Sequence, residues 1–219
     1  LVPRGGVWSG GDVLIAILCA CANAPPASLT RLAAVFTSET SLTTAISEVN
    51  LSVNKCFDAD SAKALADVIP QSKIQTLVIG PKATVVPVQQ SDVTTVDFSK
   101  QDLGPAEIMM ISAVMPFIPA VSEVNLSMNK CFGGKAGYDK YENAIQIHDT
   151  DKDQTGWTAF CEAIKDNKSI QTLAISDIGI GPVGLTTLAK FIPGSTALTE
   201  IRLDSNPITG SKYKYGVKI

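Results

Sequence analysis

A repeat of 28 residues constrains the fold of this chain more than any other feature of its sequence. Segments with the pattern apolar-x-x-apolar-x-apolar recur along it, and the interval between their central residues is 28, 19, 28, 21, 28 and 28 residues. The segment around Ile145 is a weaker member, because Glu142 stands where the first apolar residue is expected. A period of this length indicates a structure made of stacked units. The stretches NLSVNKCF (50–57) and NLSMNKCF (125–132) then occupy equivalent places in two units. The central residues are Val49, Leu77, Val96, Val124, Ile145, Leu173 and Ile201.

Each full unit combines a strand with a helix. Apolar and polar residues alternate around each central residue, which predicts a strand, and the segments that follow change to helical spacing. The two short intervals, 77–96 and 124–145, lack a helical face, so we expect extended or irregular outer segments there. The predicted helical faces are Ala62, Leu65, Ala66 and Ile69; Ile108, Ile111 and Met115; Trp157, Phe160, Cys161 and Ile164; and Leu185, Leu188, Ala189 and Ile192.

No single unit can bury its own apolar faces. Stacked in register, the strands form a parallel sheet and the helices an outer layer, with a continuous core between them. Strands lie about 4.8 Å apart and helices need more room, so the stack must curve with the strands inside.

The pattern resembles the leucine-rich repeat family, in its ribonuclease-inhibitor-like subclass of 28-residue helical units. The resemblance covers about residues 46–210 and is best over 173–198. It implies an α/β solenoid, a curved horseshoe with a parallel β-sheet on the concave face and helices on the convex face. The residues that carry it are Gly181, Gly184, Leu185, Leu188, Ala189 and Ile192.

In that family an Asn follows each strand, three residues after its last apolar position. An Asn side chain can hydrogen-bond backbone groups of its own turn and of the neighbouring unit. Only three of the seven positions carry Asn, so we expect a less regular ladder at the others. The positions hold Asn54, Lys82, Gln101, Asn129, Thr150, Ile178 and Asn206.

The resemblance divides the chain into four parts. The opening LVPRG matches a thrombin recognition sequence, so residues 1–5 are interpreted as an expression-tag remnant. Residues 6–45 form a predicted N-terminal helical cap, in which 12–24 is a buried helix or, alternatively, a signal-peptide core. Residues 46–210 form an array of about seven units, and 211–219 a C-terminal tail.

Composition narrows the classes of partner. The net charge is −3 with no long basic run, which argues against nucleic acid. The apolar run at 12–24 is shorter than the roughly 20 residues that cross a bilayer. Five cysteines without a C-x-x-C pair are interpreted as reduced, buried thiols, with Cys56 and Cys131 pointing inward, which favours the cytoplasm.

The segment DKDQTGWTAFCE (151–162) is close to the pattern of a calcium-binding EF-hand loop, with Asp151, Asp153, Thr155 and Glu162 as possible ligands. Position eight is normally aliphatic and is Thr158 here, and no second loop is present to pair with it. The repeat instead predicts a helix over 155–165, with the two aspartates ahead of it, where negative charge is favourable. We therefore expect no metal site and no cofactor.

His148 is the only histidine, predicted at the end of a strand near Ser127 and Ser176. A catalytic Ser–His pair would need a strained nucleophile turn, and no G-x-S-x-G motif occurs. The glycines of GIGPVG (179–184) fit a repeat turn better than a phosphate loop, because the Lys-Ser/Thr ending is missing. We expect no enzymatic activity.

The outward strand positions form an acidic face of small side chains, which suits a protein partner with a basic or neutral docking surface. We expect a non-enzymatic protein–protein interaction scaffold. The alternative is a regulatory repeat protein, GTPase-activating or calcium-responsive. The predicted partner-binding residues are Glu48, Asn50, Asp97, Glu123, Asn125, His148, Glu200, Arg202 and Asp204.

Overall fold

The computed structural model describes residues 47–52, 63, 67, 69–138, 144–210, 213, 214, 217 and 218. The predicted cap over 6–45, the first helical face as far as Ala66, and Asn54 lie outside the described residues, as do Cys19, Cys21 and Cys56. Among the residues that the structure describes, no helix is long and apolar enough to cross a membrane.

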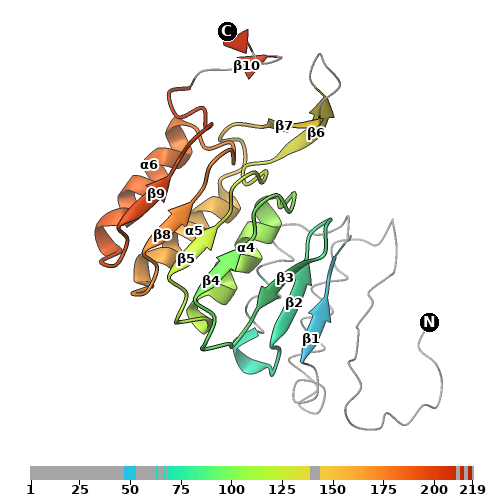
Figure 1. The fold of residues 1–219 in the computed structure, drawn as a ribbon, viewed down its shortest axis with the longest axis vertical. Coiled ribbons are helices and arrows are strands. Elements are labelled where there is room, and N and C mark those ends of the chain that lie inside the picture. Colours follow the sequence, from blue (N-terminus) through green and yellow to red (C-terminus); the bar gives the residue numbers. More distant parts are fainter. Residues whose placement is uncertain are drawn as a thin grey trace, which may run out of the picture.

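Four parallel strands form the central sheet (Figure 1). They are β4 (Thr95–Asp97), β5 (Glu123–Asn125), β8 (Thr172–Ala174) and β9 (Glu200–Arg202), in that order across the sheet. Val96 pairs with Val124, Val124 with Leu173, and Leu173 with Ile201. The predicted pairs Val96–Val124 and Leu173–Ile201 are therefore confirmed, whereas Val124 pairs directly with Leu173, without the strand of Ile145 that was predicted between them.

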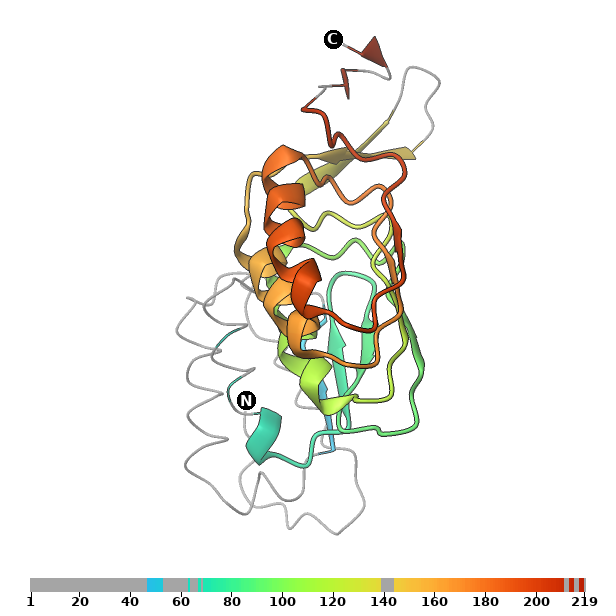
Figure 2. The ribbon, with the colours of Figure 1, turned by 90° about the vertical axis from the view of Figure 1, so that its left-hand side faces the viewer.

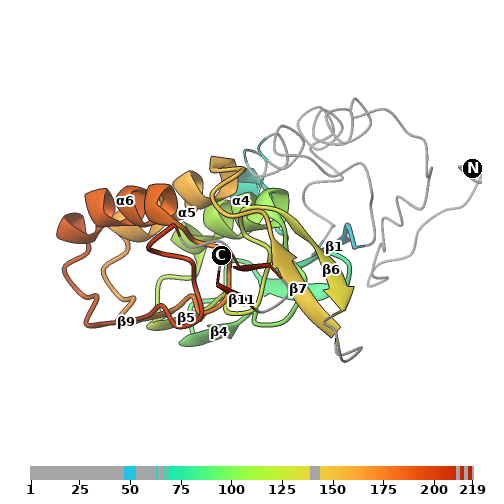
Figure 3. The same ribbon diagram turned by 90° about the horizontal axis from the view of Figure 1, so that it is seen from above.

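In the part of the chain that the structure describes, three helices cover one face of this sheet, and no described helix or strand covers the other face (Figures 2 and 3). They are α4 (Pro105–Val114), α5 (Thr155–Asp166) and α6 (Pro182–Phe191), and the 3-10 turns η2 (Met115–Phe117) and η3 (Ile192–Gly194) extend α4 and α6. Helices α4 and α6 each begin with a proline after an extended glycine, because proline lacks the N–H that a first turn leaves unpaired. The molecule is thus a mixed α/β structure with a parallel sheet.

The core lies between the sheet and the helices. The predicted inward faces of α4 and α5 are fully buried, whereas in α6 Leu188 is buried and Ala189 is exposed, so that part of the prediction is wrong. Trp157 of α5 lies between Phe132 and Phe160, and its indole N–H donates to the Gly184 carbonyl at 3.0 Å. This bond joins α5 to α6 through the core.

The parallel sheet does not continue from β4 to Leu77, which corrects the predicted ladder. Strands β1 (Glu48–Asn50) and β2 (Thr76–Ile79) pair in parallel, with Val49 opposite Leu77, but β2 pairs on its other side with β3 (Thr84–Pro87), antiparallel to it. A parallel connection needs a dozen or more residues and usually a helix. The 19-residue interval instead folds back at a tight turn, so the segment is extended as predicted but lies within a sheet.

Ile145 does not join the parallel sheet, which is the second correction. Its strand β7 (Ala144–His148) pairs antiparallel with β6 (Gly134–Tyr138). Figure 1 shows this hairpin beyond the carboxyl ends of the parallel strands. The interval from Val124 to Leu173 is 49 residues, the 28 of one unit plus the 21 that separate Val124 from Ile145. The hairpin therefore lies within the longer connection between β5 and β8.

The turns after the four parallel strands repeat the same backbone geometry. The second residue after the last apolar position of each strand has a positive φ between 53° and 61°. A left-handed residue is uncommon outside glycine, so its recurrence at one position marks equivalent turns. The four residues are Lys100, Met128, Asp177 and Ser205.

At the carboxyl end of the chain, β10 (Tyr213–Lys214) and β11 (Val217–Lys218) pair antiparallel. They belong to the predicted tail of residues 211–219.

Candidate protein-binding surface

The side of the central sheet that faces away from the helices carries mostly polar side chains in two registered rows. Thr95, Glu123, Thr172 and Glu200 form one row, and Asp97, Asn125, Ala174 and Arg202 form the next. A third row follows just after the strands: Ser99, Ser127, Ser176 and Asp204. We call these twelve residues the open sheet face. Adjacent members of a row lie on strands about 4.8 Å apart, so the rows form a continuous surface.

Local hydrogen bonds hold the middle row in place. Asp97 Oδ1 accepts from the Ser99 N–H at 2.9 Å, and Asn125 Oδ1 accepts from the Ser127 N–H at 3.0 Å. Each side chain thereby closes the turn that follows its strand.

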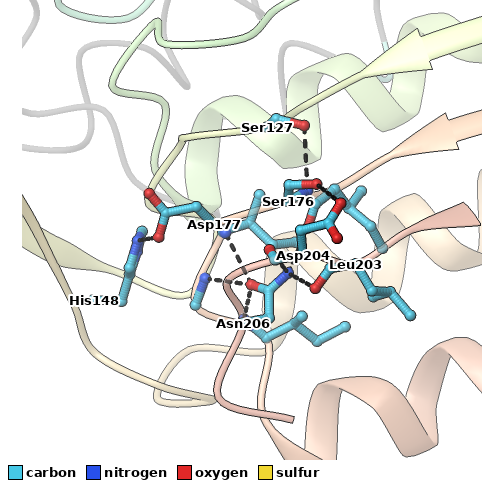
Figure 4. A network of polar contacts seen from close by, with 11 residues as sticks. Ser127, His148, Ser176, Asp177, Leu203, Asp204 and Asn206 are labelled. Carbon is cyan, nitrogen blue, oxygen red and sulfur yellow. Dashed lines mark hydrogen bonds and ion pairs between the residues drawn. The ribbon is translucent and has the colours of Figure 1, made fainter. Parts of the chain in front are cut away.

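The third row is joined across three strands. The Ser176 N–H donates to Ser127 Oγ at 3.2 Å, and Ser176 Oγ donates to Asp204 Oδ2 at 3.3 Å (Figure 4). The predicted shared column of Ser127 and Ser176 is confirmed. The Ser127 hydroxyl is thus bound to a backbone N–H, and the Ser176 hydroxyl to a carboxylate.

The open sheet face is acidic. It carries four carboxylates, on Asp97, Glu123, Glu200 and Asp204, against the single cation of Arg202, a formal balance of −4 + 1 = −3. Arg202 Nε donates to Glu200 Oε1 at 2.7 Å. This bond, followed by the charges of Glu200, Glu123 and Asp204, raises the pKa of Arg202.

The structure brings together six of the nine predicted partner-binding residues. These are Asp97, Glu123, Asn125, Glu200, Arg202 and Asp204, all on the open sheet face. Glu48 and Asn50 are half-buried on β1, in the separate three-stranded sheet. Asn50 Oδ1 accepts from the Ser52 N–H at 3.0 Å, the same local bond that Asn125 makes.

His148 does not lie in the third row, and its predicted place is wrong because β7 belongs to the hairpin. Its Nε2 lies 2.9 Å from Asp177 Oδ1, in the turn after β8 (Figure 4). The imidazole packs against Gly179, whose φ is +83°. His148 therefore links the β6–β7 hairpin to the turn that follows β8 of the central sheet. Sequence reasoning missed Asp177 because no local pattern places the hairpin beside that turn.

The predicted calcium loop has other partners for its carboxylates. Asp151 Oδ1 accepts from the N–H groups of Gly181 and Gly184, both at 2.9 Å, and its Oδ2 accepts from Val183 N–H at 2.8 Å. Asp151 thus caps helix α6, which lies thirty residues further along the chain. Asp153 Oδ1 accepts from the Thr155 N–H at 2.9 Å, at the start of α5.

The carboxylates of Asp151 and Asp153 are thus engaged with backbone N–H groups. Among the described residues, no group of three or more His, Cys, Asp or Glu side chains could hold a metal ion. The predicted helix over 155–165 is confirmed by α5, and Asp153 lies at its amino end as predicted.

Two free thiols are buried in the core. Cys131 and Cys161 have no exposed surface, which confirms that Cys131 points inward. Burial raises the pKa of Cys131, and burial followed by the charge of Glu162 raises the pKa of Cys161 to about 12. Nucleophilic chemistry needs the thiolate, so at neutral pH both side chains act as small apolar groups.

The sequence matches none of the known protein families for which a model was searched, and no curated protein matches it.

Proposed function

We propose that the chain is a leucine-rich repeat array of the ribonuclease-inhibitor-like kind and that it works as a non-enzymatic scaffold, docking a protein on the open sheet face. One observation carries the proposal: equivalent residues 28 positions apart stand side by side across the sheet. Thr172 faces Glu200, Leu173 faces Ile201 and Ala174 faces Arg202, and the same holds from β4 to β5.

The register supports a repeat array because it aligns the central residues, their neighbours and the turns that follow the strands. In the paired strands the central residue points toward the core. Its two neighbours lie on the other side of the sheet, where all of them except the buried Ala174 are at least partly exposed. A left-handed turn residue follows at the same distance. In this proposal β1, β2, β4, β5, β8 and β9 are the strands of six units, and the β6–β7 hairpin is an insertion into one of them.

The open sheet face supports protein docking through its shape and charge. Nine of its twelve side chains are no longer than that of Asn, so a partner backbone can approach the sheet closely between Glu123, Glu200 and Arg202. Its excess of carboxylates favours a partner with a basic or neutral surface, chiefly by steering and orienting the encounter. The same charge disfavours nucleic acid, and we place the protein in the cytoplasm, where the two described thiols would stay reduced.

A capture experiment with a matched control tests this function. The wild-type chain and the Asp97→Lys/Glu123→Lys variant are used as baits in lysate of the source cells. The control, Asp67→Lys/Glu162→Lys, makes the same change in net charge at two exposed residues outside the open sheet face. We expect one set of proteins bound by wild type and control and absent from the face variant. Equal binding by all three chains, or by none, contradicts the proposal.

A further inference from the structure

Strand β9 forms an edge of the central sheet with half of its backbone groups turned outward. The Glu200 N–H donates to the Gln171 carbonyl at 3.0 Å, and the Arg202 carbonyl accepts from the Ile175 N–H at 2.9 Å. Successive residues of a strand direct these groups to opposite sides. The N–H and C=O of Ile201 therefore face away from β8, and among the described strands none pairs with that side.

Apolar side chains become more exposed toward the same edge. Leu173 and Ile175 of β8 and its turn have no exposed surface, whereas Ile201 and Leu203, at the equivalent positions one unit later, are half-buried. Phe191 of α6 is also only half-buried against the core. Among the described strands none lies beside these positions as β9 lies beside their equivalents in β8, so a strand added beside β9 would remove apolar surface from water.

The charges beside Ile201 are self-complementary. Glu200 and Arg202 flank it on the open sheet face, about half exposed, and form an ion pair within the chain at 2.7 Å. An exposed pair of this kind contributes little stability, so either side chain can turn to a new partner at small cost.

We propose that the β9 edge is a dimer interface between two copies of this chain, which pair their β9 strands antiparallel about a twofold axis at Ile201. Antiparallel residues whose N–H and C=O both face the partner exchange two hydrogen bonds, and Ile201 meets that condition in both copies. Glu200 of each copy then stands opposite Arg202 of the other. The two four-stranded sheets join into one sheet of 4 + 4 = 8 strands.

The antiparallel arrangement is the one that the charges favour. A third chain cannot add, because the same edge is used by both copies, and the assembly stops at two. The open sheet faces of both copies stay on the same side and remain accessible.

Sedimentation velocity of the full chain under reducing conditions, from low micromolar to several hundred micromolar, tests the proposal. The mass should rise from 23.1 kDa to twice that value and no further. A chain that stays monomeric throughout, or whose mass grows beyond the dimer, overturns the proposal.

Charge exchange tests the register. Glu200→Arg and Arg202→Glu each place like charges opposite one another twice, which should lower the association constant about tenfold. The double variant Glu200→Arg/Arg202→Glu restores opposite charges and should restore the dimer. Single variants that associate like wild type, or a double variant that stays monomeric, contradict this register.

Two further variants distinguish an effect of the β9 edge on association from effects of other parts of the molecule. Ile201→Pro removes the outward N–H and leaves the Glu200 and Arg202 bonds to β8, so the dimer should be lost; full association by this variant overturns the proposal. Glu162→Arg makes the same charge change at an exposed residue of α5, away from the sheet, and should associate like wild type. An equal loss in Glu162→Arg would show that net charge, and not the β9 edge, controls the mass. Thermal unfolding confirms that each variant is folded.

Discussion

The side chain of Asn206 repeats, 77 residues further along the chain, the hydrogen bonds that the side chain of Asn129 makes. In both, Oδ1 accepts from N–H groups of the turn after the neighbouring strand. Nδ2 donates to two carbonyls, those of the residues directly after the neighbouring strand and after its own strand. The four partners of Asn129 are Phe98 O, Gln101 N, Leu103 N and Leu126 O, and those of Asn206 include Ile175 O, Ile178 N, Ile180 N and Leu203 O.

Asn129→Ala should lower the free energy of unfolding by roughly 3–5 kcal/mol, because Asn129 is fully buried and its loss leaves four backbone groups unpaired. Asn206→Ala should cost less, about 1–3 kcal/mol, since Asn206 is half-buried and water can reach some of its partners. Chemical denaturation measures both. Ser127→Ala, on the open sheet face, should change stability by less than about 0.5 kcal/mol. A reversed order of the two Asn variants would contradict this assignment.

Asp151→Ala should destabilise the chain by about 1–3 kcal/mol, because it removes the acceptor for three N–H groups at the start of α6. Calcium should not change the melting temperature of the wild type or the variant, measured in chelator and in excess calcium. A rise in melting temperature with calcium that Asp151→Ala abolishes would restore the calcium-loop interpretation.

Gly156→Ala should destabilise the chain by about 2–4 kcal/mol. Alanine favours helices over glycine, so propensity alone predicts the opposite sign. In α5, however, a Cβ at this position would collide with the carbonyl oxygen of Pro105, where α4 and α5 approach closely. Thr158→Ala, two residues further and half-exposed, serves as the control and should change stability by less than about 0.5 kcal/mol. Both are compared by thermal and chemical unfolding.

Glu107→Gln should stabilise the folded chain at neutral pH and have no effect in acid. Burial raises the pKa of Glu107 above its ordinary value of 4.5, against a hydrogen bond from the Gly104 N–H that lowers it. A carboxyl whose pKa is higher in the folded than in the unfolded chain costs no stability while it is protonated. The folded chain therefore loses stability as the pH rises past the ordinary value and the carboxyl would ionise. Gln retains the acceptor for Gly104. The free energy of unfolding is measured for both chains from pH 3 to pH 8. The two values should agree in acid and differ increasingly, in favour of Glu107→Gln, as the pH rises. A difference that is the same at every pH would contradict the burial effect.

Leu173→Asp should unfold the chain, since it places an unpaired charge at a fully buried position of β8. Circular dichroism would show loss of structure at room temperature. Retention of a cooperative transition near that of wild type would show that Leu173 does not face the core.

The period predicted the central sheet well because strand register depends on which residues face the core. Val96, Val124, Leu173 and Ile201 had to align once their neighbours were polar, since a shift by one residue would turn polar groups inward. The period failed at Ile145 because alternation alone fits a hairpin strand as well as a parallel one. The spacing of 21 residues between Val124 and Ile145, in place of 28, was the one feature of the sequence that indicated an insertion.

The part of the candidate site that lies on the central sheet was predictable, and the part that depends on the hairpin was not. Rows on the open sheet face follow directly from the register, so Asp97, Asn125 and Arg202 were placed correctly. His148 with Asp177, and Asp151 with the start of α6, depend on how the hairpin folds back over the turns. No local pattern specifies that packing.

Interstrand NMR contacts test the central claim most directly. Backbone cross-peaks should link Val96 to Val124, Val124 to Leu173 and Leu173 to Ile201 in one unbroken parallel series. Cross-peaks that place Ile145 beside Val124, or a register shifted by one residue, would contradict it, because Asp97, Asn125 and Arg202 would then no longer share one exposed face.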